Sequence, residues 1–333
     1  MLLLDRQDVA ALLPMADCIA AVEHAFRAHA EGALPAAPGT LATHVPGGGF
    51  HVKTAVLGPA PGYYAAKINA NFPGNPDRSG LPTVQGMIGL FDATDGRPLA
   101  LLDSIEITTL RTAAASAIAA RHLALPGAKT LLVCGCGVQG RAHLRALLTV
   151  RRLEHVYASD REPARVVAFI GELAAETGID IEPVESAAEA LPHSDIAVTC
   201  TPVRQVVVRE ADIRPGQFIA AVGADSEGKQ ELDPRVLARS RVVTDLTGQA
   251  ARMGELQHAL AAGMMDLGEV HAELGELIAG HRPGRSSAEE IFVFDSTGTA
   301  LQDVASAATA YERALATGRG LRLSLDGTDP ARA

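Results

Sequence analysis

Three closely spaced glycines give the strongest chemical signal in this sequence. Gly135, Gly137 and Gly140 form a G-x-G-x-x-G motif between an apolar run at 129–134 and a segment with helical spacing. In that context the first glycine makes a tight turn, the second lets the backbone approach a pyrophosphate, and the third lets the helix pack on the strand. The N–H groups at the helix start attract phosphate oxygens. The motif therefore predicts a nicotinamide dinucleotide site.

An acidic residue at the end of the next predicted strand bears on which dinucleotide is bound. Asp160 lies about 20 residues beyond the third glycine, where a carboxylate accepts hydrogen bonds from the ribose hydroxyls and repels a 2′-phosphate. This favours NAD. The following residue, Arg161, can accommodate the additional phosphate of NADP, so NADP stays open as an alternative.

Two later loops, at 199–202 and 222–225, also follow short apolar runs. Ligands of open α/β sheets sit at the carboxyl ends of the strands, so we expect both loops to face the nicotinamide. For the threonines of the first loop, a helix cap or a turn is an equally good interpretation. The residues expected around the cofactor are Gly135, Gly137, Val138, Gln139, Gly140, Asp160, Arg161, Thr199, Thr201 and Val222.

The elements that must position this site alternate between strand and helix patterns from Lys129 to about Asp295. Such alternation predicts a doubly wound parallel sheet with right-handed crossovers, a Rossmann α/β domain. The expected strands are 130–135, 155–159, 196–201, 218–222, 242–244 and 291–295.

The two ends of the chain do not show this alternation of strand and helix patterns. A helix is expected at 15–31, followed by short apolar runs separated by glycine- and proline-rich turns, which predicts an antiparallel sheet with hairpins. These runs are 51–57, 63–69, 86–92 and 99–103. An alanine-rich helix at 108–125 ends at a Pro-Gly pair, and a last helix at 300–316 is expected to return to the first domain. The predicted domains are 1–122 with 301–333, of α+β type, and 123–300.

Composition excludes several classes of protein. The formal net charge is −10 without a basic block, so the chain lacks the phosphate-neutralising surface of nucleic-acid binders. No run approaches the ~20 uninterrupted apolar residues of a membrane span. The N-terminus reaches charge at Asp5, too soon for a signal-peptide core. Four cysteines among 333 residues favour reduced thiols over a disulfide framework, and hence a cytoplasmic location.

Several acidic and histidine residues invite a metal interpretation. Their spacing matches no compact metal site, and we expect them to be solvated or to cap helices, with no metal bound. They are Asp245, Glu255, His258, Asp266, His271 and Glu273.

A series of short blocks carries a family resemblance. The blocks are Ala66-Lys67, Gly80-Leu-Pro-Thr-Val, Leu90-Phe-Asp92, Gly96-Arg-Pro-Leu-Ala-Leu-Leu-Asp103, Thr108-Thr-Leu-Arg111-Thr-Ala-Ala-Ala, the glycine motif, Val222-Gly-Ala-Asp225 and Gly298-Thr-Ala-Leu-Gln-Asp303. In kind and order they resemble the ornithine cyclodeaminase/μ-crystallin family over nearly the whole chain. The resemblance implies a homodimer whose chain ends form a substrate-binding and dimerisation domain. It also implies hydride transfer between nicotinamide and an α-carbon bonded to nitrogen and carboxylate.

The resemblance assigns roles to individual residues. Lys67 matches the active-site lysine, Arg111 the arginine that holds the substrate carboxylate, and Asp225 the acid facing the reacting nitrogen. A planar guanidinium suits a carboxylate because it donates paired hydrogen bonds, and a carboxylate stabilises an iminium or exchanges a proton with an amine. The family also places the backbone near Thr297 beside the cofactor.

Structural alternatives exist for each of these residues. A lysine on a strand is usually solvated. Arg111 can pair with Glu106 or Asp103, and Asp225 can cap a helix or make a turn after Gly223-Ala224.

One departure from the family concerns the substrate. Cyclodeaminases carry an arginine near the position of Thr43, and here it is missing. Lys53 and His44 are the cationic candidates in that region. His51 is expected on the same strand face as Lys53 because side chains alternate with period two. Asn71 is expected in a turn near the pocket.

These observations predict an NAD(P)H-dependent reductase of a cyclic or linear 2-imino acid, with Δ1-pyrroline-2-carboxylate to L-proline as the leading case. An ornithine or lysine cyclodeaminase with internally recycled NAD is the first alternative, and an alanine-dehydrogenase-like reductive amination the next. A non-enzymatic crystallin-like binder fits least, because a binder needs no acid beside a carboxylate clamp.

Overall fold

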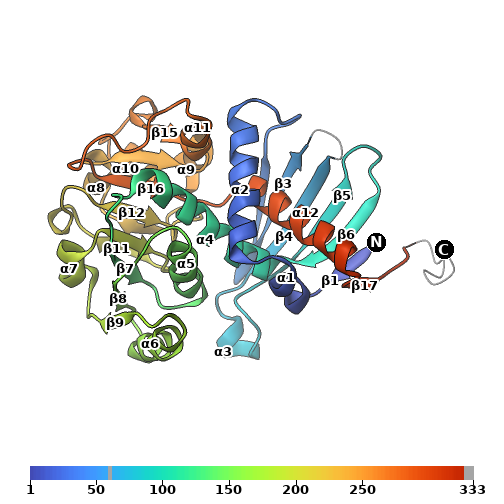
Figure 1. Ribbon diagram of the computed structural model, residues 1–333, viewed down its shortest axis with the longest axis horizontal. Coiled ribbons are helices and arrows are strands. Elements are labelled where there is room, and N and C mark those ends of the chain that lie inside the picture. The colour runs from blue at the N-terminus through green and yellow to red at the C-terminus, as the bar shows by residue number, and fades with distance from the viewer. Residues whose placement is uncertain (59–61, 326–333) are drawn as a thin grey trace. The chain divides into compact units, whose positions relative to one another are not determined.

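The computed structural model describes residues 1–58 and 62–325, which form two compact units (Figure 1). The first comprises residues 1–111 and 299–333, and the second residues 112–298. The first boundary lies inside helix α4 (Ser104–Leu123) and not after residue 122. No glycine or proline interrupts α4, so the helix continues through the unit boundary and ends beyond it.

The first unit is built on a seven-stranded sheet in the order β17-β1-β6-β5-β4-β3-β2. Its strands are β1 (Leu2–Leu4), β2 (Gly39–Val45), β3 (Gly48–Leu57), β4 (Tyr63–Asn71), β5 (Val84–Asp92), β6 (Pro98–Asp103) and β17 (Leu321–Arg322). The predicted antiparallel hairpins from β3 to β6 are confirmed. The sheet is nevertheless mixed, because β1 runs parallel to β6, and strands β1, β2 and β17 were not predicted.

Helices cover one face of this sheet. They are α1 (Arg6–Leu12), α2 (Met15–Ala30) and α12 (Ala300–Thr317), while the short α3 (Asn75–Ser79) lies in the connection between β4 and β5. The long α12 packs on β3, β4 and α2, and Figure 1 shows it crossing the sheet. Its face toward the sheet is fully buried and mainly Ala, Leu and Val, as its amphipathic pattern predicts. Charged side chains that enter this layer must therefore find partners there.

The second unit carries an eight-stranded sheet in the order β15-β14-β16-β12-β10-β7-β8-β9, and all of its strand pairs are parallel. Its strands are β7 (Thr130–Cys134), β8 (His155–Ser159), β9 (Asp180–Pro183), β10 (Ile196–Thr199), β12 (Phe218–Ala221), β14 (Arg241–Thr244), β15 (Ala272–Glu273) and β16 (Phe292–Asp295). The predicted doubly wound Rossmann fold is confirmed. Strand order reverses between β7 and β10, which is where such sheets bind ligands.

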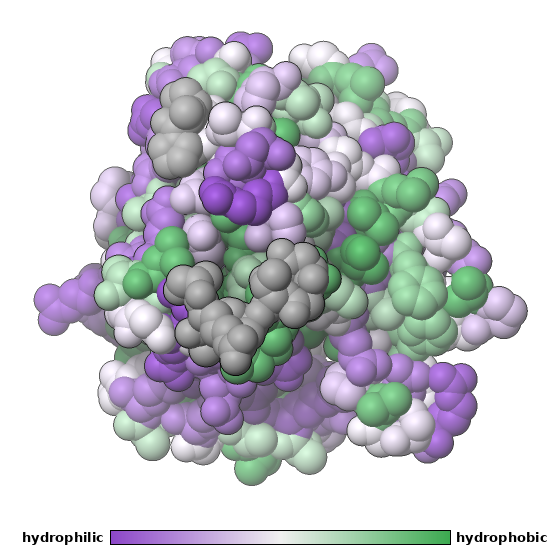
Figure 2. Space-filling view, turned by 90° about the vertical axis from the view of Figure 1, so that its right-hand side faces the viewer, coloured by the Kyte–Doolittle hydropathy of each residue, from purple (hydrophilic) through white to green (hydrophobic). Residues whose placement is uncertain are grey.

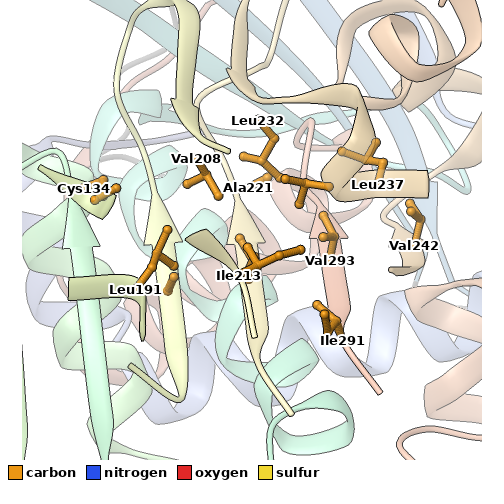
Figure 3. Close-up of a cluster of buried hydrophobic side chains, with 14 of the residues drawn as sticks. Cys134, Leu191, Val208, Ile213, Ala221, Leu232, Leu237, Val242, Ile291 and Val293 are labelled. Carbon is orange, nitrogen blue, oxygen red and sulfur yellow. The ribbon is translucent and has the colours of Figure 1, made fainter. Parts of the chain in front are cut away.

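Helices and a small second sheet complete this unit. The helices are α5 (Val138–Leu148), α6 (Pro163–Thr177), α7 (Ala187–Ala190), α8 (Pro234–Ala238), α9 (Thr247–Met253), α10 (Leu256–Ala261) and α11 (Leu274–Ala279), with 3-10 turns at Leu191–His193, Glu210–Asp212 and Leu267–Glu269. Strands β11 (Arg204–Val208) and β13 (Gln230–Leu232) pair in parallel. Their residues Val208 and Leu232 are buried with Ala221 and Val293 of the main sheet in one apolar cluster (Figure 3).

Within residues 1–58 and 62–325, no single helix is long and apolar enough to cross a membrane. Helices α1 and α2 reach that length and composition only when joined across an 82° bend.

Candidate active site

The glycine motif lies between β7 and α5, as predicted. Gly135 has a φ of +106°, a conformation that favours glycine. A Cβ at Gly140 would collide with the carbonyl oxygen of Gly135, so the third glycine is needed for the close packing of helix and strand. A Cβ at Gly137 would meet no described atom within 4 Å. The second glycine therefore leaves its backbone open to a ligand.

The donors and acceptors around this turn fit a dinucleotide. Helix α5 begins after Gly137, which has no side chain to cap the first N–H groups. The Gln139 Oε1 atom is buried and has no partner among the described residues, and Val138 is 64% exposed at the helix start. Unpaired N–H groups at a helix N-terminus bind phosphate oxygens. Gly137, Val138 and Gln139 would hold the pyrophosphate.

Asp160 lies beside the glycine motif. Its Oδ2 accepts a hydrogen bond of 2.9 Å from the N–H of Cys136, and its Oδ1 accepts one of 3.0 Å from the N–H of Glu162. Each carboxylate oxygen has a second lone pair, so both remain able to accept from ribose hydroxyls. Arg161 is exposed.

Arg141 supports the same turn and was missed by the sequence reasoning. Its guanidinium donates to the carbonyl oxygens of Cys136 and Gly137 and pairs with Glu172 at 2.7 Å. An arginine in the first turn of a helix opposes the helix dipole, and this unfavourable placement was the signal that could have identified it.

The side chains of the two later loops bind protein groups. The hydroxyl and the N–H of Thr201 both donate to Oε1 of Glu231 at 2.6 Å, and Thr199 also lowers the pKa of this carboxyl. The Thr297 hydroxyl donates to Asp245 at 2.7 Å. The interpretation as a structural residue is thus favoured for the side chain of Thr201, whereas the Thr199 hydroxyl is buried without a hydrogen-bond partner among the described residues. Cofactor contacts at these positions would come from the backbone.

In the first unit, β3 and β4 bring two lysines together. Lys53 and Lys67 are register partners, as are His51 and Asn69, so all four share the sheet face that α12 covers. The predicted alternation of His51 and Lys53 is confirmed. Only 3% of Lys67 and 8% of Lys53 is exposed. The interpretation of Lys67 as a solvated residue is therefore wrong, because α12 covers its strand.

Asp303 of α12 links Lys67 to Arg111. Its Oδ2 lies 2.7 Å from the Lys67 ammonium, and its Oδ1 accepts a hydrogen bond of 3.1 Å from Nε of Arg111. The Nη1 of Arg111 also donates to Oε1 of Gln302 at 2.6 Å. The alternative of Arg111 pairing with Glu106 or Asp103 is not seen in its described contacts. The partner is instead 192 positions away in the sequence.

This buried group of charges changes the protonation of its members. Burial lowers the pKa of Lys67 to about 7, although Asp303 opposes the change, while the neighbouring Arg111 and Lys53 add to it. Burial on its own would raise the pKa of Asp303, but the attraction of Lys67, Arg111 and Lys53 outweighs it and lowers that pKa. Asp303 is therefore ionised, and Lys67 exchanges a proton near neutral pH.

Arg111 keeps hydrogen-bonding capacity. Its described contacts use Nε–H and an Nη1–H of the five N–H donors that a guanidinium carries. The Nε2 atom of Gln302, whose Oε1 accepts from Arg111, is buried without a partner among the described residues, and so is the Oδ1 atom of Asn71, four residues along β4 from Lys67. Unsatisfied buried polar atoms are rare and point to a missing ligand. Together these groups fit a small polar molecule with a carboxylate.

The remaining predicted residues of this region lie on the same sheet. Asn71 belongs to strand β4, and the prediction of a turn is wrong at this residue because β3 and β5 pair with the strand on both sides through this position. His44 is on β2, opposite Gly49, on the sheet face of His51. It is exposed.

Asp225 is exposed in the second unit and forms an ion pair of 2.5 Å with Lys229. Among residues 1–58 and 62–325 no group of three His, Cys, Asp or Glu side chains is placed to hold a metal ion. Asp245 and Glu255 were expected to be solvated or capping, and both are instead buried, because they accept backbone hydrogen bonds inside the unit.

Comparison with known proteins relates this arrangement to a family. The family model of the ornithine cyclodeaminase/mu-crystallin family matches residues 1–318. The alanine dehydrogenase of Archaeoglobus fulgidus is 38% identical over 324 residues, which cover 97% of this chain and 98% of that protein.

Two solved structures are similar along the whole chain. An archaeal alanine dehydrogenase dimer with bound NAD has a TM-score of 0.91 and 37% identity, covering 98% of this chain and 99% of that one. The Δ1-pyrroline-2-carboxylate reductase of Thermococcus litoralis, in complex with NADH and L-proline, has a TM-score of 0.89 and 34% identity, covering 97% and 100%. The chain belongs to the ornithine cyclodeaminase/mu-crystallin family.

Proposed function

We propose that this protein reduces the C=N bond of a 2-imino acid with NADH, with Δ1-pyrroline-2-carboxylate to L-proline as the leading case. The protein is an NAD-dependent oxidoreductase of imino or amino acids, in common with its relatives. The observation that carries the finer proposal is the buried group of Lys67, Arg111 and Asp303. It combines a guanidinium with spare donors and an amine that titrates near neutral pH.

The carboxylate of the substrate is the group that Arg111 would bind. Asp303 and Gln302 hold one edge of the guanidinium, which orients the remaining N–H donors. A planar guanidinium held in this way binds a carboxylate through paired hydrogen bonds. Lys53, buried on the same face of the sheet, adds positive charge on the substrate side.

Reduction of an imine needs a hydride at carbon and a proton at nitrogen. Bound NADH supplies the hydride. Lys67 can hold or release the proton near neutral pH, since burial lowers its pKa to about 7. Asp225, by resemblance to the family, would face the nitrogen and stabilise its positive charge.

The cyclodeaminase alternative has less support from the residues. On β2, the sheet face shared with Lys67 carries Ala42 and His44 and lacks an arginine. A cyclodeaminase must also grip a distal amine and expel ammonia. A simple imine needs only a carboxylate clamp, a proton donor and the hydride donor.

The test is a comparison of substrates with the purified protein. Oxidation of NADH and of NADPH is measured with Δ1-pyrroline-2-carboxylate, with its six-membered homologue, and with pyruvate plus ammonia or methylamine. Ornithine with catalytic NAD is assayed in parallel for ammonia release. Oxidation with an imine and no ammonia from ornithine supports the proposal. Ammonia release without net oxidation of the cofactor makes the protein a cyclodeaminase instead.

We also infer a homodimer that forms through the first unit. Leu41, Val52, Ile68 and Met87 form one register row across β2 to β5, on the face opposite Lys67. Figure 2 shows apolar residues at the surface, interspersed with hydrophilic ones. In the row, Leu41, Ile68 and Met87 are 65%, 41% and 48% exposed. A contiguous apolar patch of this kind is typical of an association surface. Analytical ultracentrifugation would give the assembly state.

The reduced cysteines fit a cytoplasmic location.

A further inference from the structure

Three buried carboxylates in the second unit have no part in the proposed chemistry. Asp295, Glu255 and Glu231 are at most 1% exposed. Burial raises the pKa of Glu255 to about 9 and that of Asp295 to about 7, and it also raises the pKa of Glu231. Burying such groups is costly unless hydrogen bonds compensate, so their placement calls for an explanation.

The three acids form a chain in which each holds the backbone of the next. Both oxygens of Asp295 accept from the N–H groups of Glu255 and Leu256, at 3.0 and 2.9 Å. Both oxygens of Glu255 accept from the N–H groups of Glu231 and Leu232, at 2.7 and 3.1 Å. Asp295 is the last residue of the central strand β16, so the chain starts from a rigid element.

Glu231 is the last of the three linked acids, and its carboxylate contacts two loops that follow strands of the main sheet. Its Oε1 accepts from the N–H and hydroxyl of Thr201, just beyond β10, and its Oε2 accepts from the N–H of Gly223 at 2.8 Å, just beyond β12. One side chain therefore ties together the two loops that are expected to face the nicotinamide. A Cβ at Gly223 would collide with the Glu231 carboxylate, which explains why this position is glycine.

The same contact closes the loop that carries Asp225. This segment, residues 223–231, is here called the Asp225 loop. Its ends are joined by the hydrogen bond from Gly223 to Glu231, and within it Asp225 pairs with Lys229. The carbonyl oxygen of Lys229 lies 2.7 Å from Nε2 of His258 on α10. Glu231 thus holds the Asp225 loop at its ends, and His258 and Gln257 of α10 hold it in its middle.

We propose that Glu231 is a positioning residue for imine reduction, which holds the Asp225 loop and the segment ending at Thr201 in a single arrangement. Glu255 and Asp295 keep Glu231 in place. The inference rests on the proposed role of Asp225. It predicts that loss of Glu231 impairs hydride transfer more than cofactor binding, because the glycine motif and Asp160 are attached to other strands.

Two variants test this in the full-length protein. Glu231→Gln keeps the shape but replaces one acceptor oxygen with a donor, so one of the two loops loses its hydrogen bond. Gly223→Ala places a Cβ against both the Glu231 carboxylate and the carbonyl oxygen of Thr201, so it disturbs the same junction from the other side. Glu185→Gln, at an exposed glutamate of the same unit, is the matched control.

The first measurement is amide hydrogen exchange, which needs no catalytic activity. In Glu231→Gln, the peptide of the loop that loses its hydrogen bond, either 199–203 or 222–226, should exchange about tenfold faster, the effect of one lost hydrogen bond. In Gly223→Ala, both peptides should exchange faster. A peptide covering 135–141 should be unchanged. Unaltered exchange in the two loops would overturn the proposal. This arm remains decisive even if the wild-type protein reduces no imine, an outcome that would defeat only the proposed function.

The second measurement separates binding from turnover. With the best imine substrate, kcat should fall on the order of 10²-fold, the usual cost of a small misplacement of reacting groups, while the Kd for NADH changes less than about threefold. A primary isotope effect with deuterated NADH should rise, because hydride transfer becomes slower relative to the other steps. A merely structural role would lower NADH affinity together with kcat, and this result would also overturn the proposal.

Discussion

Replacement of Asp303 by Asn removes the carboxylate that holds Lys67 and Arg111 while preserving the shape of the side chain. The Asp303 side chain is 1% exposed, and its two oxygens lie 2.7 Å from the Lys67 ammonium and 3.1 Å from Nε of Arg111. An amide compensates neither positive charge. Breaking a buried ion pair by removing one partner costs about 3–5 kcal/mol of folding free energy. We expect Asp303→Asn to destabilise the first unit by this amount.

The loss should depend on pH in a definite direction. In the wild type the pKa of Lys67 is about 7, and Asp303 is the group that raises it against burial. Without Asp303, the pKa of Lys67 falls further below its value in the unfolded chain. The folded variant therefore loses the Lys67 proton at a lower pH than the folded wild type does. The unfolded state then binds more protons, and the variant gains stability as pH rises toward 7. The deficit is largest in mild acid and becomes constant above neutral pH.

Urea unfolding followed by circular dichroism at about pH 5.5 and about pH 8 measures both effects. Asp77→Asn, at an exposed side chain of the same unit, is the matched control and should change stability by less than about 0.5 kcal/mol. A deficit below about 1 kcal/mol for Asp303→Asn would contradict the energetic argument. An equal deficit at both pH values would show that Lys67 does not titrate in this environment.

Three further variants test the assigned roles. Arg111→Lys should raise KM for the imino acid about 10–100-fold, because a point charge cannot replace paired hydrogen bonds, and an unchanged KM would move carboxylate binding to Lys53. Asp225→Asn should lower kcat by about 10² or more with NADH affinity retained, and strong residual turnover would remove Asp225 from the mechanism. Asp160→Ser should raise the ratio of kcat/KM for NADPH over NADH about tenfold, and a constant ratio would assign cofactor selection to other residues.

The local patterns identified the elements because their causes are local. The G-x-G-x-x-G motif predicted its strand, turn and helix correctly, since Gly135 supplies its own positive φ and Gly140 packs against the carbonyl oxygen of Gly135 nearby in the chain. The strands from β3 to β6 were predicted for the same reason. The short strands β1 and β17 were missed because so few residues give no readable alternation, and only pairing with neighbouring strands makes them strands. Strand β2 was missed because most of its side chains are exposed, so no apolar side alternates with a polar one.

The sequence by itself determined the Rossmann domain, the dinucleotide turn and, through the family resemblance, the roles expected of Lys67, Arg111 and Asp225. Only the tertiary structure showed that Asp303, 192 positions beyond Arg111, holds the two cations. It likewise revealed that Glu231 joins two loops separately positioned in the chain. Such partners are decided by which faces of a helix and a sheet are packed together. Burial then makes each charge require a counter-charge or a hydrogen bond, and a sequence read one segment at a time does not say which residue supplies it.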